Sequence, residues 1–473
     1  VNLILSIKRN PYMPDLVAEP IGLIEDINSR PEDVDKLIIS NIEKATAENS
    51  NIWTSPDYNK REYIHSFFQY PARMIPAVQR KLIEIIIEAK PDIENMIDPF
   101  MGSATTLVAC MESGLNCYGQ DINPLAILIG KARTGPYYTE ALKEKSSELL
   151  KIIENDRSEN IEISFDNLSK WFKRNVIIEL SKIVRAIKKQ TSPFARRFFW
   201  VVLAETVRVT SNDRTSTYKL HVRKKEEIAK RQFSAIDVFA LHLDKCIEDF
   251  ELHANLLKEK AMLTKRSYKS KLDIILWDSK QSIYSPNNTE FYDLLVSSPP
   301  YGDNKTTVTY GQNSYLPLQW IEMSDIDPQA TKGILKTTTE IDGVLKNINE
   351  TKLHDLFFKS PTLKKTYDNV VRNSSAKHVK KVAAFFLDLD KTIDNIFSVM
   401  KPNSYQIWTI GNRTVAKVEI PNDEIIIELI TSKGGKLITQ VEREIINKRM
   451  AKKNKDTSLM NTEDILIFRK IEE

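Results

Sequence analysis

The chain of 473 residues is poor in the residue types that build disulfide frameworks and metal centres. Its three cysteines, Cys110, Cys117 and Cys246, form no Cys-x-x-Cys pair, which argues against a disulfide framework and against a thiolate zinc site. The six histidines are scattered along the chain, so a histidine-based metal centre is not expected either. The sequence therefore predicts a protein that binds no metal.

Long apolar runs are also missing. No stretch of 18 apolar residues is present, and no signal peptide is recognisable. We therefore expect a cytoplasmic protein that does not enter a membrane. Hydrophobic residues make up 41% of the chain, which is enough for a core, and the length suggests one large domain with insertions or two to three domains.

Positive charge is concentrated in one region, although the net charge of the whole chain is only +4. Residues 170–231 contain 17 Lys or Arg against 5 Asp or Glu, a local charge of +12, so the rest of the chain carries −8. A short basic run is usually a solvated helical face. An asymmetry of this size favours a polyanionic partner, and nucleic acid is the first candidate.

Hydrophobic periodicity predicts an α/β protein in which strands and helices alternate, are interrupted once, and then resume. A strand, a glycine-containing turn, a helix, a strand and an acidic residue follow one another between 93 and 121, as at the start of a doubly wound unit. From 139 to 270 the sequence reads as charged amphipathic helices with a polar loop near 210–217. The expected helices are 76–89, 105–112 and most of 340–400; the expected strands are 93–98, 117–120, 272–277, 294–297, 404–410, 424–430 and 465–468.

These elements predict a Rossmann-type α/β domain that is divided by a large helical insertion. Residues 1–60 are mildly acidic and show no clear period, so we treat them as an irregular N-terminal extension. The α/β domain would consist of 61–135 together with 271–473, and the insertion would span 136–270.

The segment 98–106, Asp-Pro-Phe-Met-Gly-Ser-Ala-Thr-Thr, lies at the carboxyl end of an expected strand, where loops converge on ligands. Gly102 lets the backbone approach a ligand closely and adopt a positive φ. Asp121 ends the next strand, where a carboxylate can accept hydrogen bonds from ribose hydroxyls. No Gly-Lys-Ser/Thr follows, so the segment is not a P-loop. The alternative interpretation is a tight turn beside an ordinary surface aspartate.

The motif Ser298-Pro299-Pro300-Tyr301 directly follows the expected strand 294–297 and is the more specific pattern. Each proline fixes its φ and has no N–H, so the chain is stiff and the prolyl carbonyls can face an amine donor. The Ser298 hydroxyl and a carbonyl that accept the two hydrogens of a base amine would aim its lone pair at an electrophilic methyl group. Tyr301 can stack on a flipped base. These four residues are the candidate catalytic residues, whereas a Pro-Pro dipeptide by itself is common in loops.

Taken together, these residues resemble the DNA amino-methyltransferases, specifically the cytosine-N4 type, whose motif is Ser-Pro-Pro-Tyr; adenine-N6 members more often carry Asp-Pro-Pro-Tyr or Asn-Pro-Pro-Tyr. The resemblance covers roughly 65–135 and 271–470. It implies a Rossmann-like methyltransferase domain, S-adenosylmethionine as cofactor and the N4 amine of a flipped cytosine in double-stranded DNA as target. A role in restriction–modification or host defence, with a cognate restriction enzyme as partner, is expected from the same resemblance.

The resemblance extends to segments around the two motifs. Residues 65–76 look like the family segment that contacts the methionine end of the cofactor, where Arg73 can pair with its carboxylate. Residues 121–124 are similar to the ribose-binding turn, and 278–279 fall where members hydrogen-bond the adenine amine. The expected cofactor-binding residues are Arg73, Asp98, Phe100, Gly102, Ser103, Thr105, Asp121, Ile122, Asp278 and Ser279.

One position departs from the family pattern. Members usually read Gly-Ser-Gly in the cofactor loop, whereas here the second glycine is replaced by Ala104. If this position needs a positive φ, an alanine costs about 1 kcal/mol. We expect slightly weaker cofactor binding and a working site.

DNA contacts are expected from the insertion, because it contains the basic region 170–231. Its loop 210–219 offers hydroxyls, an amide and an arginine for base edges and phosphates. The basic stretch 448–455 is a weaker second candidate. The expected DNA-binding residues are Arg214, Lys219, Arg223, Lys224 and Lys225.

Three other functions remain compatible with the sequence. An adenine-N6 DNA methyltransferase can use the same scaffold, and Pro-Pro-Tyr-Gly also occurs in tRNA guanine-N2 methyltransferases, although no separate RNA-capture module is seen. The third is a DNA-binding protein that has a degenerate methyltransferase fold and no catalytic activity. The replacement of the second loop glycine by Ala104 would be a mark of such degeneration. Intact Asp98, Asp121, Ser298 and Tyr301 argue against it.

Overall fold

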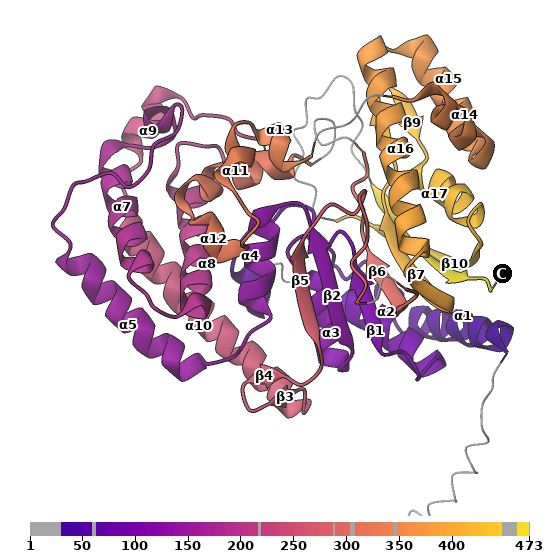
Figure 1. Cartoon of the computed structure of the whole chain (residues 1–473), viewed down its shortest axis with the longest axis horizontal. Coiled ribbons are helices and arrows are strands. Elements are labelled where there is room, and N and C mark those ends of the chain that lie inside the picture. Colours follow the sequence, from indigo (N-terminus) through magenta and orange to yellow (C-terminus); the bar gives the residue numbers. More distant parts are fainter. Residues whose placement is uncertain are drawn as a thin grey trace, which may run out of the picture.

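The computed structural model describes residues 30–58, 63–215, 219–286, 289–302, 308–343, 348–446 and 461–472; the basic stretch 448–455 lies outside them. A seven-stranded sheet with the order β10-β11-β7-β6-β1-β2-β5 runs through the centre of the molecule (Figure 1). The strands are β1 (Asn95–Asp98), β2 (Asn116–Asp121), β5 (Leu272–Leu276), β6 (Tyr292–Ser297), β7 (Met400–Ile410), β10 (Gly435–Glu444) and β11 (Thr462–Lys470).

The strand order confirms a Rossmann-like α/β fold. Strands β5, β2, β1, β6 and β7 pair in parallel, whereas β11 is antiparallel to both β7 and β10. From β1 the chain proceeds outward through β2 to β5 and then returns to place β6 on the other side of β1. This reversal makes the carboxyl ends of β1 and β6 a topological switch point, which is where open α/β sheets bind ligands.

Alternating side chains along the strands feed two hydrophobic cores. Met96 and Leu294 belong to the core on one face of the sheet, and Ile97 and Leu295 belong to the other. The first core contains residues of the N-terminal helices α1 (Pro31–Glu48), α2 (Pro76–Ala89), α3 (Thr105–Ser113) and α4 (Pro124–Arg133). The second contains residues of α14 (Glu350–Lys359), α15 (Pro361–Asn373), α16 (Ala376–Phe397) and α17 (Asn422–Thr431). Side chains on both faces of the central strands are therefore buried, as is typical of a parallel sheet that is covered on both sides.

The expected helices between 139 and 270 are present and form one lobe beside the sheet (Figure 1). Helix α8 lies at the centre of this lobe, capped by the Ser192 hydroxyl and buried along most of its length, and it packs on α4, α7 and α10. The lobe consists of α5 (Thr139–Asn155), α6 (Leu168–Trp171), α7 (Arg174–Lys188), α8 (Pro193–Thr210), α9 (Lys225–Lys230), α10 (Ala235–Glu259) and the hairpin β3 (Leu263–Thr264) and β4 (Ser267–Tyr268). The buried side chains of this lobe belong to the first of the two hydrophobic cores, so the lobe and one face of the sheet share a core.

The remaining elements are short and lie between the larger ones. They are η1 (Tyr63–Ser66), α11 (Tyr310–Trp320), α12 (Met323–Ile326), η2 (Lys332–Leu335), α13 (Thr338–Ile341), β8 (Arg413–Val415) and β9 (Val418–Ile420). None of the helices in the described parts of the chain is both long enough and apolar enough to cross a membrane.

Two predictions from periodicity were wrong, and one strand was missed. The expected strand 424–430 is part of helix α17, where the β-branched run favours a strand locally but Ile425, Ile426, Leu429 and Ile430 are buried at helical spacing. The region 1–60, expected to be irregular, contains helix α1. Strand β10 was not predicted, because it is an edge strand with few buried side chains.

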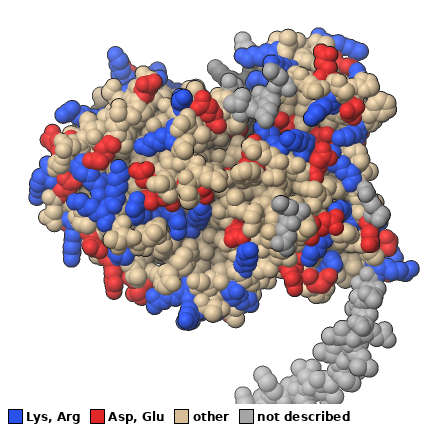
Figure 2. All heavy atoms as spheres, in the orientation of Figure 1, with Lys and Arg blue, Asp and Glu red and all other residues tan. Residues whose placement is uncertain are grey.

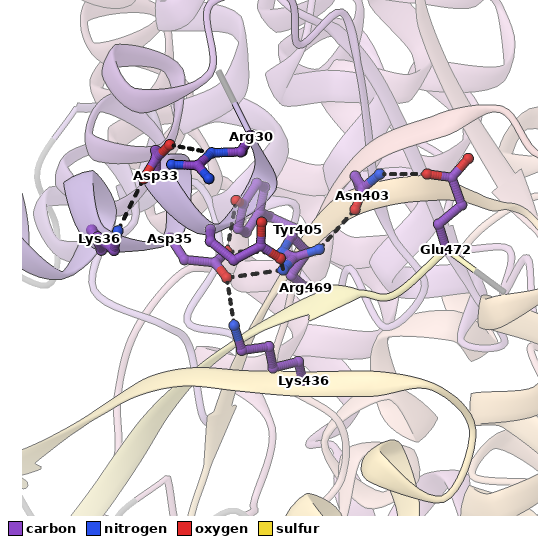
Figure 3. Close-up of polar contacts among 10 residues, drawn as sticks. Arg30, Asp33, Asp35, Lys36, Asn403, Tyr405, Lys436, Arg469 and Glu472 are labelled. Carbon is purple, nitrogen blue, oxygen red and sulfur yellow. Dashed lines mark hydrogen bonds and ion pairs between the residues drawn. The ribbon is translucent and has the colours of Figure 1, made fainter. Parts of the chain in front are cut away.

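A buried carboxylate fastens helix α1 to the sheet (Figure 3). Asp35 accepts hydrogen bonds from Arg469 Nε at 2.9 Å, from the Tyr405 hydroxyl at 3.0 Å and from Lys436 Nζ at 3.0 Å. These three partners come from β11, β7 and β10, so one side chain ties the N-terminal helix to three strands. Removing one partner of a buried ion pair typically costs about 3–5 kcal/mol, so the contact anchors this end of the molecule.

Candidate functional site

A cavity of about 450 Å³ opens at the switch point, within the size range of small-molecule sites. The loops after β1, β2, β5 and β6 form its floor, and α11, α13 and α16 contribute side chains around it. The residues expected from the sequence that line it are Arg73, Phe100, Gly102, Ser103, Thr105, Asp121, Ile122, Asp278, Ser279, Ser298 and Pro300. The expected residues Asp98, Pro299 and Tyr301 are not among the lining residues.

The cofactor loop predicted at 98–106 is clamped to the end of β2. Gly102 has φ +48° and donates its N–H to Asp121 Oδ2 at 2.9 Å, while Asn123 N donates to Asp121 Oδ1 at 2.8 Å. A Cβ at Gly102 would lie 3.3 Å from the Tyr70 ring, so a side chain there would meet both strain and a close contact. Burial raises the pKa of the Asp121 carboxyl to about 6.

Ala104 adopts the left-handed conformation, with φ 61° and ψ 31°, just before helix α3 begins. The structure therefore shows that this position adopts a positive φ, which a β-carbon opposes. The methyl group is fully buried, so its packing offsets part of that strain.

Asp98 lies behind the cavity and joins the two motifs. It is fully buried, and its Oδ1 accepts hydrogen bonds from Ser297 Oγ at 2.6 Å and from Phe100 N at 3.1 Å. Burial raises the pKa of its carboxyl to about 7. Ser297 ends β6, and Phe100 lies in the loop after β1. This carboxyl therefore joins the end of β6 to the loop after β1.

The loop after β5 is fixed from two sides. The Ser279 hydroxyl donates to Pro99 O at 2.6 Å and accepts from Gln120 Nε2 at 2.9 Å. Lys280 reaches Asp388 on α16 at 3.2 Å, and its backbone N–H donates to Asp278 Oδ1 at 3.0 Å. Asp278 thus faces the cavity from a loop that is bonded to its neighbours.

The Ser-Pro-Pro-Tyr turn is held by residues from the C-terminal part of the chain. Asn422 Nδ2 donates to the Tyr301 carbonyl at 2.9 Å, and the Tyr301 hydroxyl donates to Glu463 Oε1 at 3.0 Å. Burial raises the pKa of the Tyr301 phenol well above its ordinary value. A Cβ at Gly302 would lie 1.8 Å from the Arg413 guanidinium, so any other residue after the motif would have to displace the Arg413 side chain.

Two arginines converge behind the cofactor loop. Arg133, which is fully buried, donates to Ser103 O at 2.5 Å and to His65 O at 3.2 Å, and Arg73 donates to the same His65 carbonyl at 2.5 Å. Among the described residues, no carboxylate forms an ion pair with Arg133. Sequence analysis missed Arg133, although a lone arginine within the apolar helix α4 was an available signal.

The predicted DNA-binding loop lies beside the cavity. It is closed by a backbone bridge between Asp213 and Val222, and Leu220 N donates to Gln312 Oε1 at 2.9 Å. Gln312 itself lines the cavity. Lys224 and Lys225 are exposed at the start of α9, whereas Arg223 is half-buried. The segment that follows this loop therefore contacts, through Leu220, a residue that lines the cavity.

Part of the charge of 170–231 is neutralised within the protein. Arg185 pairs with Asp156 at 2.8 Å, Arg196 with Asp325 at 2.6 Å and Arg208 with Glu205 at 2.5 Å. On the face shown in Figure 2, basic side chains of this lobe alternate with acidic ones. In the described positions no cluster of His, Cys, Asp or Glu could hold a metal ion.

Comparison with known proteins identifies the family. A family model described as DNA methylase matches residues 24–132. The chain is 33% identical over 453 residues to the type II methyltransferase M.MvaI of Kocuria varians, covering 93% of this chain and 96% of that protein. It is 27% identical over 202 residues to the type II methyltransferase M.MjaII of Methanocaldococcus jannaschii, covering 42% of this chain and 29% of that protein. With its Rossmann-like sheet, its cavity at the switch point and a full-length relative of this identity, the chain belongs to the type II DNA methyltransferases.

Proposed function

We propose that this methyltransferase transfers a methyl group from S-adenosylmethionine to the N4 amine of a cytosine that is flipped out of double-stranded DNA. The observation that carries the proposal is that one cavity is lined both by the cofactor loop, through Gly102 and Ser103, and by Ser298 of the Ser-Pro-Pro-Tyr motif. A methyl donor and a base amine held in one cavity can react directly.

The residues around the cavity fit the cofactor. Arg73 offers a cation for the methionine carboxylate, Asp121 offers an acceptor for the ribose hydroxyls, and Asp278 offers an acceptor for the adenine amine. Ser103 Oγ is buried and has no hydrogen-bond partner in the described structure, so it is available to a ligand. When bound, S-adenosylmethionine supplies an electrophilic methyl group on a sulfonium.

The chain's own residues would orient the amine. A base amine is a poor nucleophile because its lone pair is delocalised into the ring. The Ser298 hydroxyl and the Pro299 carbonyl, accepting its two hydrogens, would direct the lone pair towards the cofactor side of the cavity. Base flipping costs a few kcal/mol, which contacts between the base and the residues that line the cavity would have to offset.

Ser298 favours cytosine over adenine, since adenine-directed members of the family tend to have Asp or Asn at this position. The alternative is adenine N6 on the same scaffold. The test is mass spectrometry of nucleosides from DNA methylated by the purified protein. N4-methylcytosine is the expected product, and N6-methyladenine without N4-methylcytosine would overturn the choice of base.

On the DNA side, we infer that the insertion 136–270 contributes target recognition and that Arg214, Lys219, Arg223, Lys224 and Lys225 contact DNA. The contact between Leu220 and Gln312 supports this, because it places their loop beside the cavity that would receive the flipped base. We further propose that a cognate restriction enzyme cuts the same sequence. Cleavage of unmethylated but not methylated DNA by a nuclease encoded beside this chain is the result expected.

A further inference from the structure

The hydroxyl of Tyr301 is tethered to an ion pair on the far edge of the sheet. It donates to Glu463 Oε1 at 3.0 Å, and Glu463 is also paired with Arg443. Glu463 lies on β11 and Arg443 on the adjacent β10, with only 12% and 9% of their side chains exposed. No sequence motif marks these two residues, because they lie far from Tyr301 in the chain.

The single proton of the Tyr301 phenol determines which group donates in the contact between Ser298 and Tyr301. A phenol has a single proton, and Tyr301 gives its proton to the Glu463 carboxylate. The contact of 3.1 Å between Ser298 Oγ and Tyr301 Oη must therefore be donated by Ser298. The lone pairs of Ser298, which lines the cavity, are then left to accept a hydrogen from a ligand.

We propose that Ser298, Tyr301 and Glu463 form a relay that holds Ser298 as an acceptor and removes the proton of the methylated amine. This inference rests on the proposed function. Ser298 contacts the base and is catalytic, whereas Glu463 acts through Tyr301 and is a positioning residue. Such an acceptor chain is needed because the amine nitrogen becomes positively charged as it takes the methyl group with its lone pair.

In this relay the proton passes stepwise from the base amine to Glu463. One N–H bond of the amine breaks, its electron pair stays on nitrogen, and its proton bonds to Ser298 Oγ. The Ser298 hydroxyl proton moves to Tyr301 Oη, and the Tyr301 phenolic proton moves to the Glu463 carboxylate. A neutral methylamino group remains on the base, and Glu463 later releases the proton to water. The described residues that line the cavity include no histidine that could replace this chain.

The test uses Tyr301→Phe, Glu463→Gln and the double variant, with Glu442→Gln as control. Tyr301→Phe keeps the ring but removes the hydroxyl, and Glu442 is an exposed glutamate on the same strand as Arg443. Single-turnover methyl transfer is measured at saturating cofactor and DNA. Cofactor affinity is measured by calorimetry and DNA affinity by fluorescence anisotropy.

We expect each single variant to slow methyl transfer by about 100-fold, the size of a typical acid–base contribution, with both affinities changed less than about twofold. The double variant should be no slower than the slower single variant, because both changes break one chain. The control should match the wild type.

Wild-type rates in both single variants, or two losses that multiply in the double variant, would overturn the relay. A loss of DNA or cofactor affinity that accounts for the whole effect would show a structural role and also overturn it. Wild-type protein that makes no methylated base counts against the proposed function itself, so the two failures are distinguishable.

Discussion

The cofactor loop and the Ser-Pro-Pro-Tyr turn lie at the ends of adjacent parallel strands, yet they are held in place in different ways. Within the cofactor loop, Gly102 is fastened by a residue nearby in the chain, because Asp121 accepts its backbone N–H. The first residues of this loop, Asp98 and Pro99, are also bonded from farther along the chain, by Ser297 and Ser279. The Ser-Pro-Pro-Tyr turn is fastened by Asn422 and Glu463, which lie more than a hundred residues later in the chain. The first support is readable from sequence spacing, and the second becomes visible only when the sheet is assembled.

This difference separates binding from chemistry. The residues around the cofactor loop offer charged groups to a ligand, so changes there should alter cofactor affinity. The Ser-Pro-Pro-Tyr turn offers a hydroxyl acceptor and a stiff carbonyl, so changes there should alter the rate of transfer. The following predictions test whether the two halves of the site can be separated in this way.

Ser298→Ala should have the largest effect. It removes the acceptor of one amine hydrogen, and we expect the rate of methyl transfer to fall by about 100-fold or more. Cofactor affinity should change less than about twofold, because the cofactor contacts lie on the other loops. Single-turnover kinetics and calorimetry measure the two quantities. An equal loss in both would show that the two halves of the site are not separable.

Asp121→Ala should show the opposite pattern. The change removes a charged acceptor that also clamps Gly102, and such hydrogen bonds are worth about 1.5–3 kcal/mol, or about 10–100-fold in affinity. We expect weaker binding of S-adenosylmethionine with nearly unchanged DNA binding. Asp273→Ala is the control, because Asp273 pairs with Lys271 and does not line the cavity. Unchanged cofactor affinity in Asp121→Ala would remove Asp121 from the site.

Replacing Arg223, Lys224 and Lys225 by glutamine tests the DNA side. Each phosphate contact adds about 0.9 to the slope of log affinity against log salt, so the slope should fall by up to about 2.7. Fluorescence anisotropy over a range of salt concentrations measures it. Three exposed lysines on other helices, Lys44, Lys151 and Lys258, changed in the same way, are the control. An unchanged slope would mean that these three residues make no phosphate contacts and that the loop has only a structural role.

Sequence patterns predicted the parallel strands and the two motifs, because buried strands leave an apolar run and each motif is continuous in the chain. They failed for α17, where the run of β-branched residues around Ile425 favours a strand locally while burial at helical spacing decides for a helix. They also missed Arg133 and Glu463, whose partners Ser103 and Tyr301 are distant in sequence. Contacts across the sheet depend on strand order, which local patterns do not specify.

The smallest expected effect is that of Ala104→Gly, which restores the usual family residue. Glycine relieves about 1 kcal/mol of strain at φ 61°, but it also frees the unfolded chain and removes a fully buried methyl group, and each of these costs roughly as much. We therefore expect the free energy of unfolding to change by less than about 1 kcal/mol and the affinity for S-adenosylmethionine to rise by a few fold at most. Thermal melting and calorimetry measure the two effects. Ala109→Gly is the matched control, since Ala109 is equally buried but lies within helix α3, where glycine should destabilise by about 1 kcal/mol. A gain in cofactor affinity above about tenfold would mean that Ala104 distorts the whole cofactor loop. The loop would then not be firmly held, and its contrast with the Ser-Pro-Pro-Tyr turn, which residues far along the chain hold, would no longer stand.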